Sequence, residues 1–234
     1  MALGVLVIWT RNPSRSAGLA ATGVVVLIAA LMPPAAGAAG RYVATGDSVA
    51  AGFAASDPPT RGYVPLFFDF LKTRTGGGLD QLVNRAVPGT TSGGMRTNGQ
   101  LAAARGDIDD RSTDTKVVTV TIGGNDALGG DCASGFGERD ACPFVANFEA
   151  ILRELKNSLA ADPGAEELLV TTYYNPSKGT PNEPRARGRL LGTDSVVDCA
   201  GTGAEIGLND AISCRGAALG AIVVDVYPAF YESQ

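Results

Sequence analysis

Short apolar runs rich in β-branched residues alternate with segments of helical periodicity along most of the chain. The runs at 41–45, 81–83, 116–122, 167–174 and 221–227 predict five strands. We find no internal repeat and no linker between them. Strand–helix alternation of this kind favours one α/β domain, with a parallel sheet covered by helices on both faces.

The segments between the strands contain apolar residues at helical spacing. The clearest is 144–161, where an apolar stripe from Phe144 to Leu159 marks one face and Pro163 stops the helix. An aromatic stripe from Tyr63 to Leu71 predicts a second helix, and 205–219 predicts a third.

Two further segments are irregular in sequence. The stretch 93–104 is expected to form a loop and a short helix. The stretch 178–192 combines two prolines with Arg185, Arg187 and Arg189, and is interpreted as an exposed insertion.

Three small or polar residues directly follow the first three strands: Ser48, Gly89 and Asn125. Ligands of parallel sheets bind outside the carboxyl ends of the strands, so these residues are expected to converge in one crevice. A serine at a strand-to-helix turn can expose its hydroxyl near free N–H donors, which suits a nucleophile. We therefore expect a helix to start at Ser48, with Asp47 bracing the turn.

Each of these residues also has a purely structural interpretation. Gly-Asp-Ser is common at helix N-caps and turns, Gly89 could be a turn residue after Pro88, and Asn125 and Asp126 could cap a helix. Asp126, Asp131 and Asp140 lack calcium-loop spacing, so they are interpreted as solvated loop carboxylates.

Taken together and in this order, the motifs resemble those of the SGNH hydrolases, also called the GDSL esterase/lipase family. Three of that family's four blocks match: Gly46-Asp47-Ser48, the loop from Asn84 to Gly89, and Gly123-Gly124-Asn125-Asp126. The resemblance spans most of residues 41–234. It implies a three-layer α/β/α fold with a flavodoxin-like, parallel five-stranded sheet.

The resemblance also implies a chemistry and its residues. Ser48 would attack an ester carbonyl and form an acyl-enzyme. The N–H groups of Ser48 and Gly89 and the side-chain amide of Asn125 would hold the oxyanion. Neither a cofactor nor a metal is expected, and the substrate would be a small-molecule or lipid ester.

The family's fourth block, Asp-x-x-His, is missing, and the whole chain contains no histidine. Asp225 lies within the expected fifth strand and is followed three residues later by Pro228. We expect the domain at 41–234 to be truncated before this block. The alternative is a catalytically dead module that keeps the cleft and binds acyl or glycan ligands.

The N-terminal segment and the charge bear on location and partners. Arg11 and Arg15 precede an apolar run at 17–32 and the sequence Ala36-Gly37-Ala38, which together predict a signal peptide over residues 1–40 and a secreted protein. An uncleaved membrane anchor is the alternative, and it would bring membrane contact. A net charge of −5 without a basic cluster excludes nucleic acid as an expected partner. We expect a monomer.

The four cysteines agree with export. Of three possible connectivities, the sequence-local pairs Cys132–Cys142 and Cys199–Cys214 are favoured because each closes a short loop. No C-x-x-C spacing or histidine supports a zinc site.

Overall fold

A computed structural model describes residues 40–76, 78–129, 132, 135–136, 142–161, 166–192 and 206–232. They belong to one compact unit, Ala36–Gln234. Residues 1–39 of the expected leader lie outside the described residues. In the ranges described, no helix has both the length and the apolar character needed to cross a membrane.

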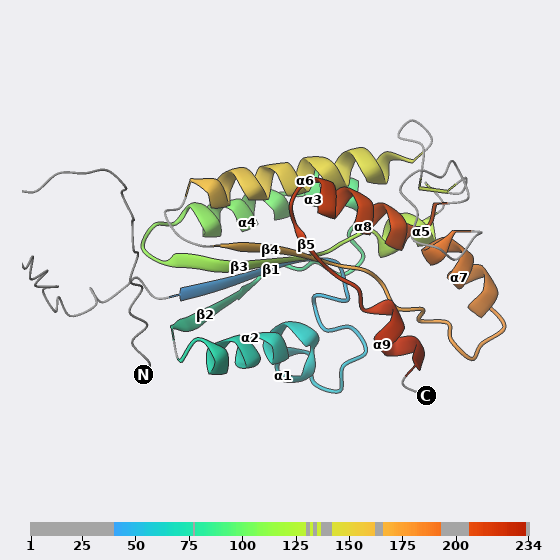
Figure 1. The fold of residues 1–234 in the computed structure, drawn as a ribbon, viewed down its shortest axis with the longest axis horizontal. Helices are drawn as coiled ribbons and strands as arrows, with labels where there is room; N and C mark the ends of the chain where they lie inside the picture. The colour runs from blue at the N-terminus through green and yellow to red at the C-terminus, as the bar shows by residue number, and fades with distance from the viewer. Residues whose placement is uncertain are drawn as a thin grey trace, which may run out of the picture. The chain divides into compact units, whose positions relative to one another are not determined.

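A parallel five-stranded sheet forms the centre of this unit (Figure 1). The strand order is β2-β1-β3-β4-β5, so the predicted flavodoxin-like sheet is confirmed. β1 lies between β2 and β3, and its Tyr42 pairs with Leu82 on one side and Val117 on the other. The strands are β1 (Gly40–Gly46), β2 (Leu79–Asn84), β3 (Asp114–Thr121), β4 (Glu167–Thr171) and β5 (Ile222–Val224).

Helices cover both faces of the sheet, as Figure 1 shows. One face carries α3 (Ser92–Thr97), α4 (Gln100–Asp109), α6 (Pro143–Ala160) and α8 (Leu208–Ala218). The other face carries α1 (Pro58–Arg61) and α2 (Tyr63–Arg74).

The alternation of side chains along β1 divides the core between these two layers. Val43 packs into the larger cluster, with the apolar stripe of α6. Tyr42 and Ala44 point the other way and pack with residues of α2 such as Val64 and Phe67. The helix predicted over 144–161 is therefore confirmed, within one residue at each end.

The predicted end of the fifth strand is wrong. The fifth strand ends at Val224, and α9 (Tyr227–Glu232) begins where the sequence predicted more strand. Asp225 explains the change, because its carboxylate accepts hydrogen bonds from the Thr172 hydroxyl at 2.7 Å and the Tyr227 N–H at 3.1 Å. This side chain turns the backbone at the strand end, so Asp225 lies outside the strand.

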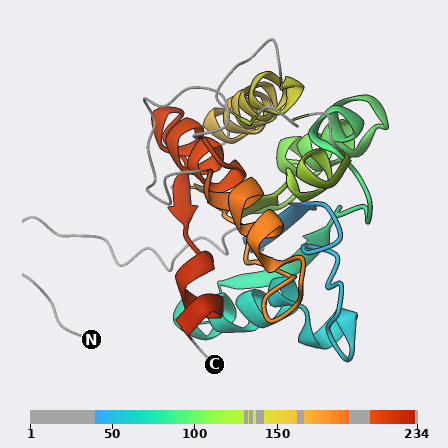
Figure 2. The same ribbon diagram turned by 90° about the vertical axis from the view of Figure 1, so that its right-hand side faces the viewer.

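The segment 178–192 is more than an exposed insertion. It contains α7 (Glu183–Leu191), whose Leu190 is buried in the core beside residues of α8. In Figure 2, α7 (orange) lies in front of the sheet.

Candidate active site

Ser48 follows β1 in a tight turn. The turn begins because Gly46 adopts φ 137°, and a Cβ atom there would lie 2.0 Å from the Thr121 carbonyl oxygen. The Asp47 N–H donates to that same carbonyl at 2.9 Å. Residues 48–54 form successive turns, so the expectation of a helix starting at Ser48 is wrong. Ser48 itself is half-buried.

Asp47 braces this turn, as predicted. One carboxylate oxygen accepts the Val49 N–H at 3.0 Å, and the other accepts the hydroxyl of Tyr173, which follows β4. The side chain is 1% exposed. Burial raises the pKa of Asp47 above its ordinary value of 3.8, despite the two hydrogen bonds that favour its charged form.

The loop after β2 is tied to the same turn. The Val87 N–H donates to the Gly46 carbonyl at 2.9 Å, and the buried Gln100 side chain donates to it at 2.6 Å. The Thr90 N–H donates to the Val87 carbonyl, and Gly89 adopts φ 81°. A turn with proline second and a positive-φ glycine third is the type II pattern, so Gly89 has a structural reason to be glycine.

Asn125 lies in α5 (Gly124–Gly129), directly after β3. Its Nδ2 donates to the Thr90 carbonyl at 2.8 Å, which places the amide next to the loop that carries Gly89. A primary amide has a second N–H, so Asn125 keeps one donor for another acceptor.

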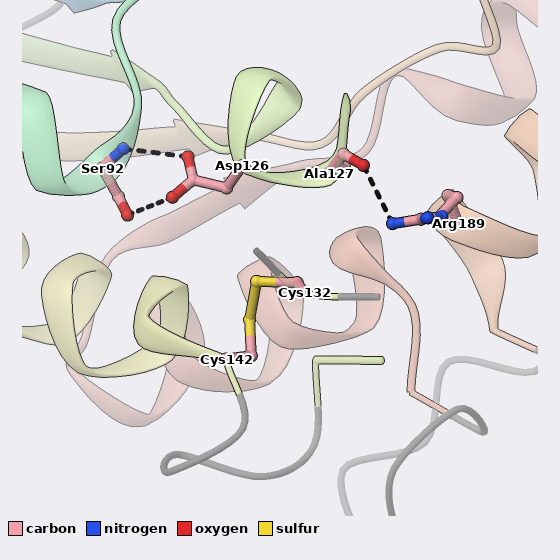
Figure 3. Close-up of a disulfide and its surroundings, with 6 residues drawn as sticks. All are labelled: Ser92, Asp126, Ala127, Cys132, Cys142 and Arg189. Atoms are coloured by element: carbon pink, nitrogen blue, oxygen red, sulfur yellow. Dashed lines mark hydrogen bonds between the residues drawn. A yellow bond between two sulfur atoms is a disulfide. The ribbon is translucent and has the colours of Figure 1, made fainter. Parts of the chain in front are cut away.

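Asp126 is not a solvated loop carboxylate. It is 3% exposed and accepts both the N–H and the hydroxyl of Ser92, at the start of α3 (Figure 3). The sequence interpretation failed because the partner is 34 positions away. Asp126 thereby joins α5 to α3 and holds the neighbouring Asn125 in place. Asp131 and Asp140 lie outside the described residues.

Ser48 and Asn125 line one cleft with a volume of about 410 Å³. Gly89 is not among its described lining residues, although Thr90 beside it accepts the hydrogen bond from Asn125. The rest of the wall comes largely from β1–α1 turn residues, α5, the β4 end and α7. The described lining residues are Asp47, Ser48, Val49, Phe53, Gly124, Asn125, Ala127, Leu128, Tyr173, Tyr174, Pro176, Ser177, Asn182, Arg185, Ala186, Arg189 and Leu190.

Sequence reasoning missed Tyr173 and the residues of α7 as parts of this cleft. Tyr173 follows β4, so the rule that selected Ser48 and Asn125 at strand ends would have found it too. Asn209 in α8 holds its backbone through two hydrogen bonds, at 2.8 and 2.9 Å. No sequence pattern indicated that the arginines of α7 would line the cleft, because they do not follow a strand. Their position depends on how the segment 178–192 packs against the rest of the domain.

The titratable groups of the cleft offer Ser48 no ready base. Both carboxylate oxygens of Asp47 already accept hydrogen bonds. Burial raises the pKa values of Tyr173 and Tyr174, and arginine stays protonated. Among the described lining residues, then, none is suited to take a proton near neutral pH, and the chain has no histidine.

Cys132 and Cys142 form a disulfide, the first of the two predicted pairs (Figure 3). Cys214 is also disulfide-bonded, and Cys199 lies outside the described residues. Within the described part of the chain, no cluster of three metal-ligating side chains occurs.

A family model for the GDSL-like lipase/acylhydrolase family matches residues 44–234. The chain belongs to this family. The resemblance drawn from the three motifs is thus confirmed, and the family assigns the chain to the hydrolases that act on ester bonds.

Solved structures support the fold of this family member. A protein described as a GDSL-like lipase from Parabacteroides merdae matches with a TM-score of 0.56 and 14% identity, over 84% of this chain and 82% of that one. A member of the lipolytic G-D-S-L family from Veillonella parvula matches with a TM-score of 0.53 and 15% identity, over 83% and 82%. No curated protein matches the chain.

Proposed function

We propose that the protein is a secreted carboxylic-ester hydrolase in which Ser48 is the nucleophile. The observation that carries the proposal is that Ser48 and Asn125, from separate strand ends, line the same cleft. In the described part of the chain, the Ser48 hydroxyl donates to no other group, so it is available to a substrate.

The proposed reaction begins at Ser48. The Ser48 Oγ forms a bond to the ester carbonyl carbon and passes its proton to solvent water, or to imidazole where it is added, and the carbonyl oxygen becomes an oxyanion. The Ser48 and Gly89 N–H groups and the second Asn125 N–H are the proposed donors to it. Collapse of this intermediate breaks the bond to the alcohol, which leaves with a proton. Water then cleaves the acyl group from Ser48.

Removal of the Ser48 hydroxyl proton limits the rate of ester hydrolysis. Serine hydroxyls need a base, and the chain has no histidine. Serine hydrolases that lack a triad member keep only about 10³–10⁴-fold acceleration over water. We therefore propose slow turnover for residues 1–234.

The missing histidine also favours a second candidate function, a non-catalytic module that binds acyl ligands in the same cleft. The two functions differ in whether Ser48 reacts when a base is supplied.

The deciding experiment measures hydrolysis of 4-nitrophenyl butyrate with and without added imidazole, a soluble substitute for the missing base. Ser48→Ala is compared with Ser177→Ala, which removes another serine hydroxyl of the same cleft. We expect imidazole-stimulated turnover in the wild type and Ser177→Ala, and none above background in Ser48→Ala. Equal rates in all three proteins would reject the hydrolase and favour the binding module.

A further inference from the structure

The charged side chains of the cleft are mostly cationic, in a chain whose net charge is −5. Its described lining includes Arg185 and Arg189 of α7 and a single carboxylate, Asp47. Asp47 is buried, and its carboxylate already accepts hydrogen bonds from Tyr173 and Val49. It therefore does not face a ligand that enters the cleft from solvent. The charge that an entering ligand meets on this wall is therefore positive.

Arg189 is held in place at this wall. Its guanidinium donates to the Ala127 carbonyl in α5 at 3.0 Å, across 62 positions of sequence (Figure 3). Ala127 is two residues beyond Asn125, so the anchor fixes the cation on the side of the cleft that carries the proposed oxyanion donor. A guanidinium has five N–H donors, and this bond uses one of them.

Arg185 lies one helical turn before Arg189 and projects from the same side of α7. Among the described residues it has no ion-pair or hydrogen-bond partner. Arg187, between them, is not part of the described lining. Two guanidinium groups spaced four residues apart on one helix can together bind a small anion through charge-assisted hydrogen bonds.

The cleft also offers an apolar surface. Phe53 is 72% exposed and Leu128 is 83% exposed, and both line it. Large apolar side chains that are exposed beside a cleft commonly bind the apolar portion of a ligand. The cleft is therefore suited to a molecule with both an acyl chain and an anionic group.

We infer that the substrate is an ester carrying an anionic group, a carboxylate or a phosphate, which Arg185 and Arg189 bind while the acyl chain lies against Phe53 and Leu128. This inference rests on the proposed function for the position of the ester at Ser48. It adds that the two arginines determine specificity without taking part in bond cleavage.

Binding tests the anion independently of turnover. Isothermal titration calorimetry would compare three ethers that cannot be hydrolysed: neutral 1-O-butylglycerol, 1-O-butylglycerol 3-phosphate and 3-O-butylglycerate. The proteins are the wild type, Arg185→Gln/Arg189→Gln and Arg74→Gln. Arg74 is an exposed arginine at the end of α2, outside the described cleft lining, and its guanidinium lies over the Phe70 ring.

The wild type and Arg74→Gln should bind at least one anionic ether about tenfold more tightly than the neutral one, with the advantage shrinking in high salt. The double variant should lose this preference while its weak binding of the neutral ether stays unchanged. The phosphate and carboxylate ethers show which anion the site prefers. Equal binding of neutral and anionic ethers by the wild type, or a preference that survives in the double variant, would overturn the inference.

Hydrolysis of 1-butyrylglycerol and its 3-phosphate, with imidazole and the Ser48→Ala control, separates the two proposals. Ser48-dependent cleavage of both esters at equal rates would reject the anion preference and keep the hydrolase. Arginine-dependent binding of the phosphate ether without Ser48-dependent cleavage of either ester would reject the hydrolase and keep the anion site.

Discussion

At the scale of single residues, Asp47 shows how an acid beside the proposed nucleophile, Ser48, can have a structural task. Its two oxygens bind the Val49 N–H and the Tyr173 hydroxyl, which fixes the turn on which Ser48 lies. Asp47 is 1% exposed, so the turn is held at the cost of burying an ionisable group.

The buried carboxyl predicts a pH dependence of stability. Burial raises the pKa of Asp47 in the folded chain above its ordinary 3.8, so as the pH rises past 3.8 the unfolded chain loses this proton first. Its contribution to the free energy of unfolding therefore falls as the pH rises from 3.8 to the folded-state pKa. Asp47→Asn has no such titration.

Urea unfolding of the wild type and Asp47→Asn at several pH values measures this contribution. The stability of the wild type relative to the variant should decrease with rising pH across the window. A relative stability that increases with pH would mean that the hydrogen bonds outweigh burial and lower the pKa instead.

Asn125 carries the second prediction at this scale. Asn125→Ala removes the proposed oxyanion donor and should lower kcat/KM about 10²–10³-fold in the imidazole-supplemented assay, with KM little changed. Asn182→Ala is the matched control, because it removes an amide from the same cleft without removing that donor. A similar loss in both variants would point to general disturbance of the cleft.

At the scale of elements, the close approach of β1 to β3 at Gly46 fixes the turn that leads from β1 to Ser48. Gly46→Ala places a Cβ 2.0 Å from the Thr121 carbonyl oxygen at a φ of 137°, so we expect it to cost about 3 kcal/mol of stability or more. Gly106→Ala, exposed within α4 with no atom within 4 Å of its Cβ, should instead gain about 0.5–1 kcal/mol.

Urea denaturation of the two alanine variants checks this contrast. The opposite signs separate a packing clash from a general effect of replacing glycine by alanine. A tolerated Gly46→Ala would require β1 and β3 to separate at this point, and the Asp47 N–H would then lose its bond to Thr121.

At the scale of the whole molecule, export remains a prediction, motivated by the leader and the cysteines. When the protein is expressed in an exporting host, N-terminal sequencing should find the leader removed close to the end of the predicted 1–40 segment, after Ala36-Gly37-Ala38. Mass spectrometry of non-reduced peptides should find Cys132 joined to Cys142. Retention in membranes with the leader intact would support the anchor instead.

The sequence alone predicted the architecture and placed two of the cleft residues, Ser48 and Asn125, at strand ends. Apolar β-branched runs and the helical stripe of α6 are local patterns, and parallel strands bring their carboxyl ends to one edge by topology. That is why Ser48 and Asn125 could be placed in one crevice before any contact was known. The three motifs likewise identified the family.

Only the tertiary structure decided which partners these residues have. Tyr173 meets Asp47 across 126 positions, Asp126 meets Ser92 across 34, and Arg189 meets Ala127 across 62. No local pattern encodes such pairs, because a side chain's partner depends on which elements pack against its own. The segment 178–192 was therefore predicted to be an exposed insertion. In the structure it packs beside the strand ends and supplies Arg185 and Arg189 to the cleft.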